Sequence, residues 1–93
     1  DKSGEANALT NIGHIYSYLG NHQKALEFYN QALTLSQKFA SKSEQAATLN
    51  GIGRTFYHLG EYKKALEYYN QTLILYREVN DKQGEANSLN NIG

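Results

Sequence analysis

The sequence predicts an all-α fold in which five helices form antiparallel hairpins that stack as an α-solenoid. Two observations predict it. Residues 18–33, YLGNHQKALEFYNQAL, return forty positions later as HLGEYKKALEYYNQTL, and the apolar residues within each copy recur with the period of a helix. Residues 1–40 and 41–80 share 17 identities in 40 positions without a gap, and residues 81–93 match residues 1–13 at 10 of 13. A fixed period of this length is typical of repeat arrays.

The period divides the chain, as a single domain, into repeat 1 (1–40), repeat 2 (41–80) and half repeat 3 (81–93). Because the third unit is a half and the chain begins at Asp1 without Met, we expect it to be a piece of a longer array.

The first helix of each unit is expected over residues 2–19, 42–59 and 82–93. In the first of these, apolar and small residues share one face at helical spacing: Leu9, Ile12, Gly13, Tyr16 and Leu19. In the last helix, we expect the corresponding contacts with the fourth helix to come from Ala86, Leu89 and Ile92.

The second helix of each unit is expected over residues 22–39 and 62–79, after a turn at Gly20 or Gly60. Its broader apolar face consists of Ala25, Leu26, Tyr29, Ala32, Leu33, Ser36 and Phe39. Ser41 and Glu44 have the spacing of a capping box, and Asn80 suits a left-handed residue at a helix end.

Glycine recurs at positions 13 and 53 on the inward face of a helix, where it costs roughly 1 kcal/mol relative to alanine. This cost indicates that another helix approaches closely there. We expect its small partners to be Ala25 and Ala65. One hairpin cannot bury its own apolar face, and the repeated segment provides a second hairpin against which it can stack.

At these residues the sequence resembles the tetratricopeptide repeat. The series that carries the likeness is Leu9, Ile12-Gly13, Tyr16, Ala25, Tyr29 and Ala32, and in the second unit Leu49, Ile52-Gly53, Phe56, Ala65, Tyr69 and Thr72. The unit of forty exceeds the family's usual length of about 34. It is similar to the lengthened repeats of Pins-like polarity scaffolds and of bacterial signalling arrays. The resemblance implies a right-handed superhelix and a protein-interaction scaffold without catalytic activity or cofactor.

A helix turns about 100° per residue, which places a polar stripe opposite the apolar face. The resemblance implies that this stripe lines a concave groove that binds a peptide or a segment of a partner protein. The candidate binding residues are Asn7, Asn11, His14, Tyr18, Asn50, Arg54, Tyr57, His58, Asn87 and Asn91, with Thr10, Ser17, Ala47, Gly51 and Asn90 beside or among them.

The chemistry of the stripe suits a peptide. Asparagine amides both donate and accept hydrogen bonds, so they can hold a peptide backbone of any sequence. Arg54, with two histidines nearby, can receive a carboxylate, and the tyrosines offer flat area for an apolar side chain. Gly51 stands where the other units have Asn and interrupts the row. The alternative interpretation is a solvated polar face of a structural spacer.

Composition excludes several classes of protein. Nine Lys and Arg balance nine Asp and Glu, so the concentrated basic surface of a nucleic-acid binder is absent from the sequence. No run of about 20 apolar residues predicts a membrane span, and no signal peptide begins the chain. The absence of Cys excludes disulfides and favours a cytoplasmic location.

Four further sequence features have ordinary structural interpretations. Gly51-Ile52-Gly53 follows no strand, and the sequon Asn70-Gln71-Thr72 lies in mid-helix. The three histidines fall in different helices without acidic partners, so neither a metal site nor a catalytic triad is expected. Ile74, on an outer polar face, is either a lone exposed apolar residue or the centre of a convex contact.

The half repeat leaves apolar surface without its usual hairpin partner. Repeat arrays need polar capping elements at their ends. We therefore expect open ends to associate between chains, by end-to-end stacking or helix exchange. In this alternative the chain is a spacer or assembly module whose groove holds no ligand.

Overall fold

The computed structural model describes residues 1–92, which form five α-helices. In chain order they are α1 (Lys2–Tyr18), α2 (His22–Phe39), α3 (Lys42–His58), α4 (Tyr62–Glu78) and α5 (Lys82–Ile92). Every predicted helix is present, and each predicted end within residues 1–92 is right to within one residue. Residue 93, assigned to the last predicted helix, lies outside the described residues.

Polar side chains cap most helix starts. Asp1, Asn21 and Ser41 each accept a hydrogen bond from the backbone N–H three residues later, which satisfies one of the free donors of the first turn. Ser41 thereby performs the predicted half of a capping box. The other half is absent, because the Glu44 carboxylate accepts a hydrogen bond from the Ser3 hydroxyl of α1 at 3.1 Å instead.

The turns follow the predicted glycines. Gly20 and Gly60 have φ angles of 82° and 80°, in the left-handed region that favours glycine. In each turn the next residue donates back to a carbonyl five positions earlier, as in a Schellman motif. Asn80, with φ 59°, ends the second hairpin as predicted.

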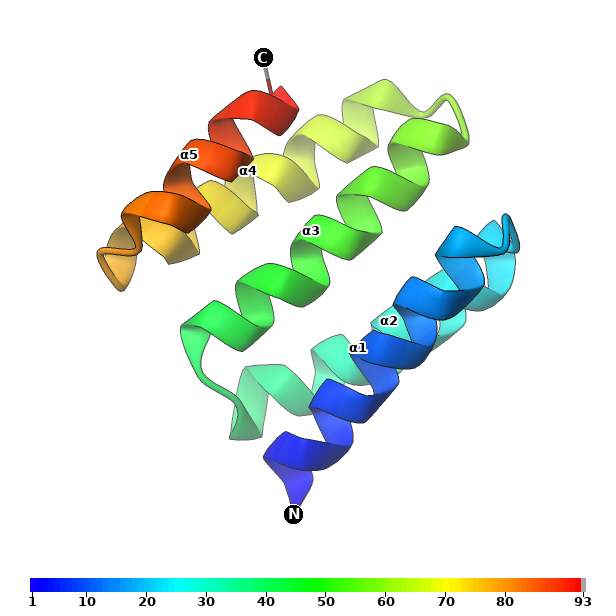
Figure 1. The fold of residues 1–93 in the computed structure, drawn as a ribbon, viewed down its shortest axis with the longest axis horizontal. Coiled ribbons are helices and arrows are strands. Elements are labelled where there is room, and N and C mark those ends of the chain that lie inside the picture. Colours follow the sequence, from blue (N-terminus) through cyan, green and yellow to red (C-terminus); the bar gives the residue numbers. More distant parts are fainter. Residues whose placement is uncertain (93) are drawn as a thin grey trace.

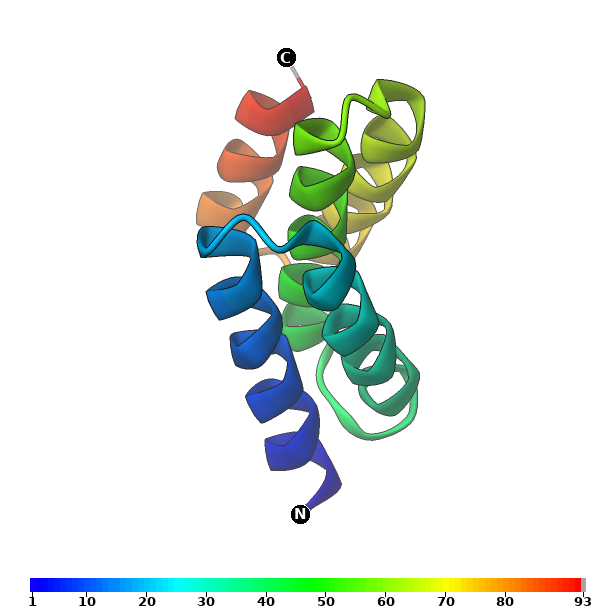
Figure 2. The ribbon, with the colours of Figure 1, turned by 90° about the vertical axis from the view of Figure 1, so that its right-hand side faces the viewer.

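The helices form two layers. α1 packs along α2 and α3 along α4, while α2 contacts α3 and α4 contacts α5 (Figure 1). In the side view, α1 and α5 lie on one side with α3 set back between them, and α2 and α4 lie on the other side (Figure 2). The fold is therefore a helical repeat solenoid whose concave side is lined by α1, α3 and α5. No helix of residues 1–92 combines the length and apolarity needed to cross a bilayer.

The core runs through the junction of the two hairpins. Ala25, Tyr29 and Ile52 are buried together, and partly buried Leu26 and Leu33 pack around them. Each hairpin adds a stacked aromatic pair at equivalent positions, with ring centroids 5.5 Å apart for Tyr16–Phe28 and 5.6 Å apart for Phe56–Tyr68. The shared phrase therefore builds the same packing twice.

The predicted inward face of α1 was partly wrong. The fully buried residues are Ala6, Thr10 and Gly13, whereas Leu19 is 68% exposed. α1 contacts both α2 and α3, so its buried arc is wider than one stripe and turned toward α3. Thr10, expected beside the groove, is buried in this contact, where its hydroxyl oxygen lies 2.8 Å from that of Thr48 in a hydrogen bond.

The predicted partners of the inward glycines were incomplete. A Cβ added at Gly13 would lie 2.6 Å from Cδ1 of Tyr29, and one at Gly53 would lie 2.8 Å from Cε1 of Tyr69. The nearest atoms thus belong to a tyrosine ring of the facing helix, on which Ala25 and Ala65 are also buried. Phe39, expected to be inward, is 51% exposed.

α5 packs through a face other than the predicted one. Gly84 and Ser88 are buried, while Ala86 is exposed and Leu89 is 46% exposed. Only Ile92 of the predicted residues is partly buried. Leu89 corresponds to Leu49, which is 5% exposed and lies between side chains of α2 and α4. Leu89 therefore has no equivalent cover within the described residues.

Candidate functional site

The concave face holds two adjacent hollows with a shared wall. The first hollow has a volume of about 420 Å³, and the second about 550 Å³. Arg54 and His58 of α3 line both. The other residues of the first hollow are His14, Ser17, Tyr18, Tyr29 and Gly51, and those of the second are Tyr57, Tyr69, Asn90, Asn91 and Ile92.

Tyr29 forms the floor of the first hollow. Its ring is 1% exposed and lies between Gly13 of its own hairpin and Gly51 of the next, where an added Cβ would lie 2.7 Å from Cζ. Its hydroxyl oxygen lies 2.7 Å from Nδ1 of His14, in a hydrogen bond whose proton either atom can hold. Gly51, which the sequence suggested was a gap in the asparagine row, instead makes room for this ring.

The walls of the hollows carry positive charge without a negative partner. Neither lining includes an Asp or Glu, and the ion pairs recorded within residues 1–92 do not involve Arg54. Burial, followed by the nearby Arg54 charge, lowers the pKa of His14 below its ordinary value of 6.5. A chain of zero net charge thus has a locally cationic groove.

Burial also raises the pKa of both floor tyrosines, Tyr29 and Tyr69, while the Arg54 charge acts in the opposite direction. Both phenols therefore stay protonated at neutral pH and can donate hydrogen bonds. The Tyr29 hydroxyl is already engaged by the hydrogen bond with His14.

Exposed aromatic rings form the rim of the groove. Tyr18 of α1 is 92% exposed and Tyr57 of α3 is 51% exposed. Tyr57 packs edge-on against Tyr62 at 5.2 Å and against His58 at 5.8 Å between ring centroids, and His58 stacks on His22 at 6.0 Å. These ring contacts hold the Tyr57 side chain in place at the rim.

The asparagines divide into two groups. Asn91 lines the second hollow, and its Nδ2 donates to Oδ1 of Asn50 at 2.9 Å, which joins α5 to α3. Asn7, Asn11 and Asn87 are exposed and line neither hollow. A continuous row of asparagines along the groove is therefore not formed.

The structure brings together about half of the predicted site. Six of the ten predicted residues line the hollows: His14, Tyr18, Arg54, Tyr57, His58 and Asn91. Sequence reasoning missed the floor, because Tyr29 and Tyr69 lie on the core side of their helices. The signal that could have found them is the glycine facing each ring, at positions 13 and 53.

The polar groups of the site belong to a few chemical classes. Within residues 1–92, no three His, Asp or Glu side chains lie close enough together to bind a metal ion. The polar lining groups are amides, phenols, imidazoles, one hydroxyl and one guanidinium. Groups of these kinds form hydrogen bonds, charge interactions and stacking contacts.

Comparisons with known proteins give a consistent result. A family model described as tetratricopeptide repeat matches residues 6–39, and a second model with the same description matches residues 44–93. No curated protein matches the chain at a significant level.

Proposed function

The chain belongs to the tetratricopeptide repeat family, whose repeats mediate protein–protein interactions, and from this premise we propose that its concave groove binds a segment of a partner protein. In this proposal the partner presents a carboxylate to Arg54, and apolar side chains on either side of it enter the two hollows. The observation that carries the proposal is the position of Arg54 on the wall between two tyrosine-floored hollows without an acidic residue in their lining.

Each group in the groove has a role in this proposal. The Arg54 guanidinium forms charge-assisted hydrogen bonds, which are stronger than neutral ones. The exposed rings of Tyr18 and Tyr57 cover the partner's apolar side chains from the rim. Asn91, already held by Asn50, presents its remaining amide groups to the partner backbone. The groove binds and carries out no catalysis.

A peptide-library pull-down tests this function. The parent chain should enrich peptides that combine an acidic residue with apolar neighbours. Arg54→Ala should weaken binding of a selected peptide at least about fivefold, since a hydrogen bond to a charged group contributes about 1 kcal/mol or more. The Arg54→Ala/Asn91→Ala double variant should lose more affinity. Lys38→Ala, which removes an exposed cation on the outer face of α2, is the matched control and should bind like the parent.

Two outcomes would contradict the proposal. Equal binding by the parent and Arg54→Ala would show that the peptide does not use the groove. No enrichment by the parent would favour a structural spacer.

A second candidate function is assembly through the terminal helices. It is favoured by the apolar side chains that both ends leave uncovered, Leu89 of α5 at 46% exposure and Ile15 of α1 at 58%. Under this function, association between copies replaces or accompanies binding in the groove.

A further inference from the structure

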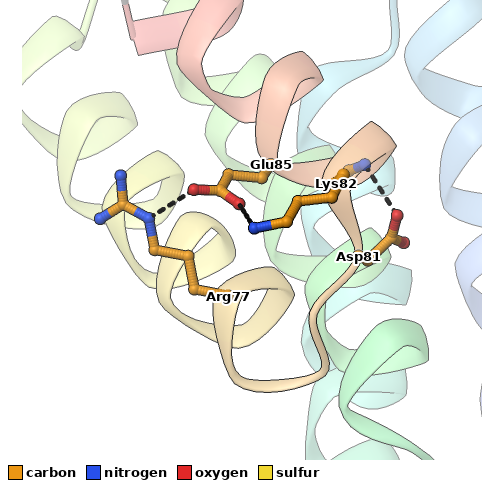
Figure 3. A network of polar contacts seen from close by, with 5 residues as sticks. Arg77, Asp81, Lys82 and Glu85 are labelled. Carbon is orange, nitrogen blue, oxygen red and sulfur yellow. Dashed lines mark hydrogen bonds and ion pairs between the residues drawn. The ribbon is translucent and has the colours of Figure 1, made fainter.

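The contact between α4 and α5 has two specific components. Gly84 lies under the Tyr76 ring, where an added Cβ would be 2.5 Å from Cδ1. Arg77 Nε donates to Oε1 of Glu85 at 2.9 Å, with Lys82 beside the same carboxylate (Figure 3). Ser88, 1% exposed, is the other buried residue of α5. The inward side of α5 therefore presents glycine, glutamate and a small residue at positions 84, 85 and 88.

α1 carries the same face without using it. Gly4, Glu5 and Ala8 stand at the equivalent positions, within a stretch identical to α5 at 10 of 13 residues. All three are exposed. Only Asp1 comes within 4 Å of a Cβ added at Gly4, and the one recorded ion pair of Glu5 is with Lys2 at 3.6 Å.

α1 has three features that would favour it on the α4 surface. The Ser88 hydroxyl is buried without a hydrogen-bond partner, and such a group costs its full desolvation energy. Ala8 at the same position has no hydroxyl to leave unsatisfied. Asn11, equivalent to Asn91, can replace it as the donor to Asn50. α1 also brings its own hairpin partner, α2, whereas the Leu89 side of α5 is uncovered.

We propose that α1 of a second copy displaces α5 from α4, so that two copies join head to tail. This replacement of α5 by α1 is the helix exchange, and the resulting contact between α4 and α1 is the exchanged contact. Gly4 of the incoming helix then lies under Tyr76, and Glu5 accepts the hydrogen bond from Arg77. The second copy continues the solenoid in the register of the internal repeat, and α5 of the first copy is released. This inference rests on the second candidate function, assembly, and is independent of the groove.

Charge reversal at two equivalent positions tests the exchange. Glu5→Lys places two cations together in the exchanged contact but leaves the contact between α4 and α5 intact. The dissociation constant for self-association of the Glu5→Lys variant of the 93-residue chain, measured by sedimentation equilibrium, should rise about tenfold relative to the parent. Glu85→Lys weakens the hold of α5 on α4 and so frees the surface for α1. The dissociation constant for self-association of the Glu85→Lys variant should therefore fall. The same substitution thus acts in opposite directions at positions 5 and 85.

Gly4→Leu supplies a second, uncharged test. The added side chain should collide with Tyr76 in the exchanged contact and weaken association, whereas Asn7→Leu, on an exposed face that does not meet α4, should associate like the parent. Circular dichroism establishes that each variant keeps the parent's helix content.

The outcomes separate the exchange from assembly in general. A parent that stays monomeric at every concentration would overturn both. Association that is unchanged by Glu5→Lys and Gly4→Leu, or that Glu85→Lys fails to strengthen, would overturn the exchange and leave assembly to another contact.

Discussion

The first hairpin (α1 and α2) and the second hairpin (α3 and α4) hold equivalent tyrosines in different surroundings. Tyr29 is 1% exposed and is confined on both sides by glycine, at position 13 in its own hairpin and at position 51 in the next. Tyr69 is 5% exposed and has glycine on one side only, at position 53. The position equivalent to Gly51 is occupied by Asn91, which lines a hollow with Tyr69.

The difference indicates that residues shared by the repeats and residues that vary between them have separate structural roles. The residues kept at every fortieth position build each hairpin. The residue supplied by the following helix decides how tightly the hairpin is joined to it. Glycine at position 51 admits the Tyr29 ring between two hairpins, so we expect the first joint to be the more rigid one.

The inward glycines give the largest expected contrast. Gly13→Ala should lower the free energy of unfolding by about 1–3 kcal/mol, because the added methyl group collides with a ring that glycine confines on its other side. Gly53→Ala should cost less, because the Tyr69 ring can shift toward the second hollow. Urea denaturation of both variants measures the contrast.

Gly4→Ala is the control for this pair, since the added methyl group meets only the side chain of Asp1. It should leave stability unchanged or raise it by up to about 1 kcal/mol through helix propensity. A cost at Gly53 equal to that at Gly13 would remove the distinction between the two joints.

The N-termini of α2 and α4 give a difference in stability of intermediate size between the two hairpins. Asn21 and Glu61 have nearly the same backbone angles, φ −88° and ψ 80° against φ −93° and ψ 72°, but only Asn21 caps its helix with a side-chain hydrogen bond. Asn21→Ala should therefore cost about 1 kcal/mol and Glu61→Asn should gain a similar amount in thermal unfolding. A loss of stability in Glu61→Asn would mean that the second turn cannot accept the cap.

The smallest effect concerns position 14, where the first hairpin has His and the second has Arg54. The pKa of His14 is lowered in the folded chain, so below about pH 6.5 the unfolded chain binds the proton more readily. His14 therefore contributes a loss of stability as the pH falls from about 6.5 through its folded pKa, and no change above that range.

His14→Gln should reduce this dependence on pH, measured as the difference from the parent in denaturation between neutral and acid pH. A His14 pKa at or above its ordinary value, measured by NMR titration, would contradict the prediction.

The helices could be predicted from the sequence because their limits are set locally. Glycine and asparagine in left-handed conformation end helices α1, α3 and α4, and Asn21 and Ser41 begin helices by capping them. These signals depend on a few neighbouring residues. They gave every helix end within residues 1–92 to within one residue.

The buried faces were harder to predict, since a periodic pattern describes one face and a helix in a stack has several. α1 meets α2 on one side and α3 on another, so Thr10 is buried although it is polar. In α5 the contact is made by Gly84 and Ser88, whose small size gave no hydrophobic signal.

The candidate site was predicted in its walls and missed in its floor. Arg54, His14 and His58 were found because polar residues opposite an apolar face point to solvent. Tyr29 was assigned to the core alone. Its second role depends on Gly51 of another hairpin, a relation between distant residues that no local pattern contains.

A double-mutant cycle between Tyr29 and Gly51 tests the joint between the hairpins most directly. In the parent, Gly51→Ala should lower the free energy of unfolding by about 1–3 kcal/mol, because its methyl group would meet the end of the tyrosine ring. In a Tyr29→Leu background that end is gone, so the same substitution should be neutral or stabilise by up to about 1 kcal/mol. An equal loss in both backgrounds would show that the ring does not join the two hairpins.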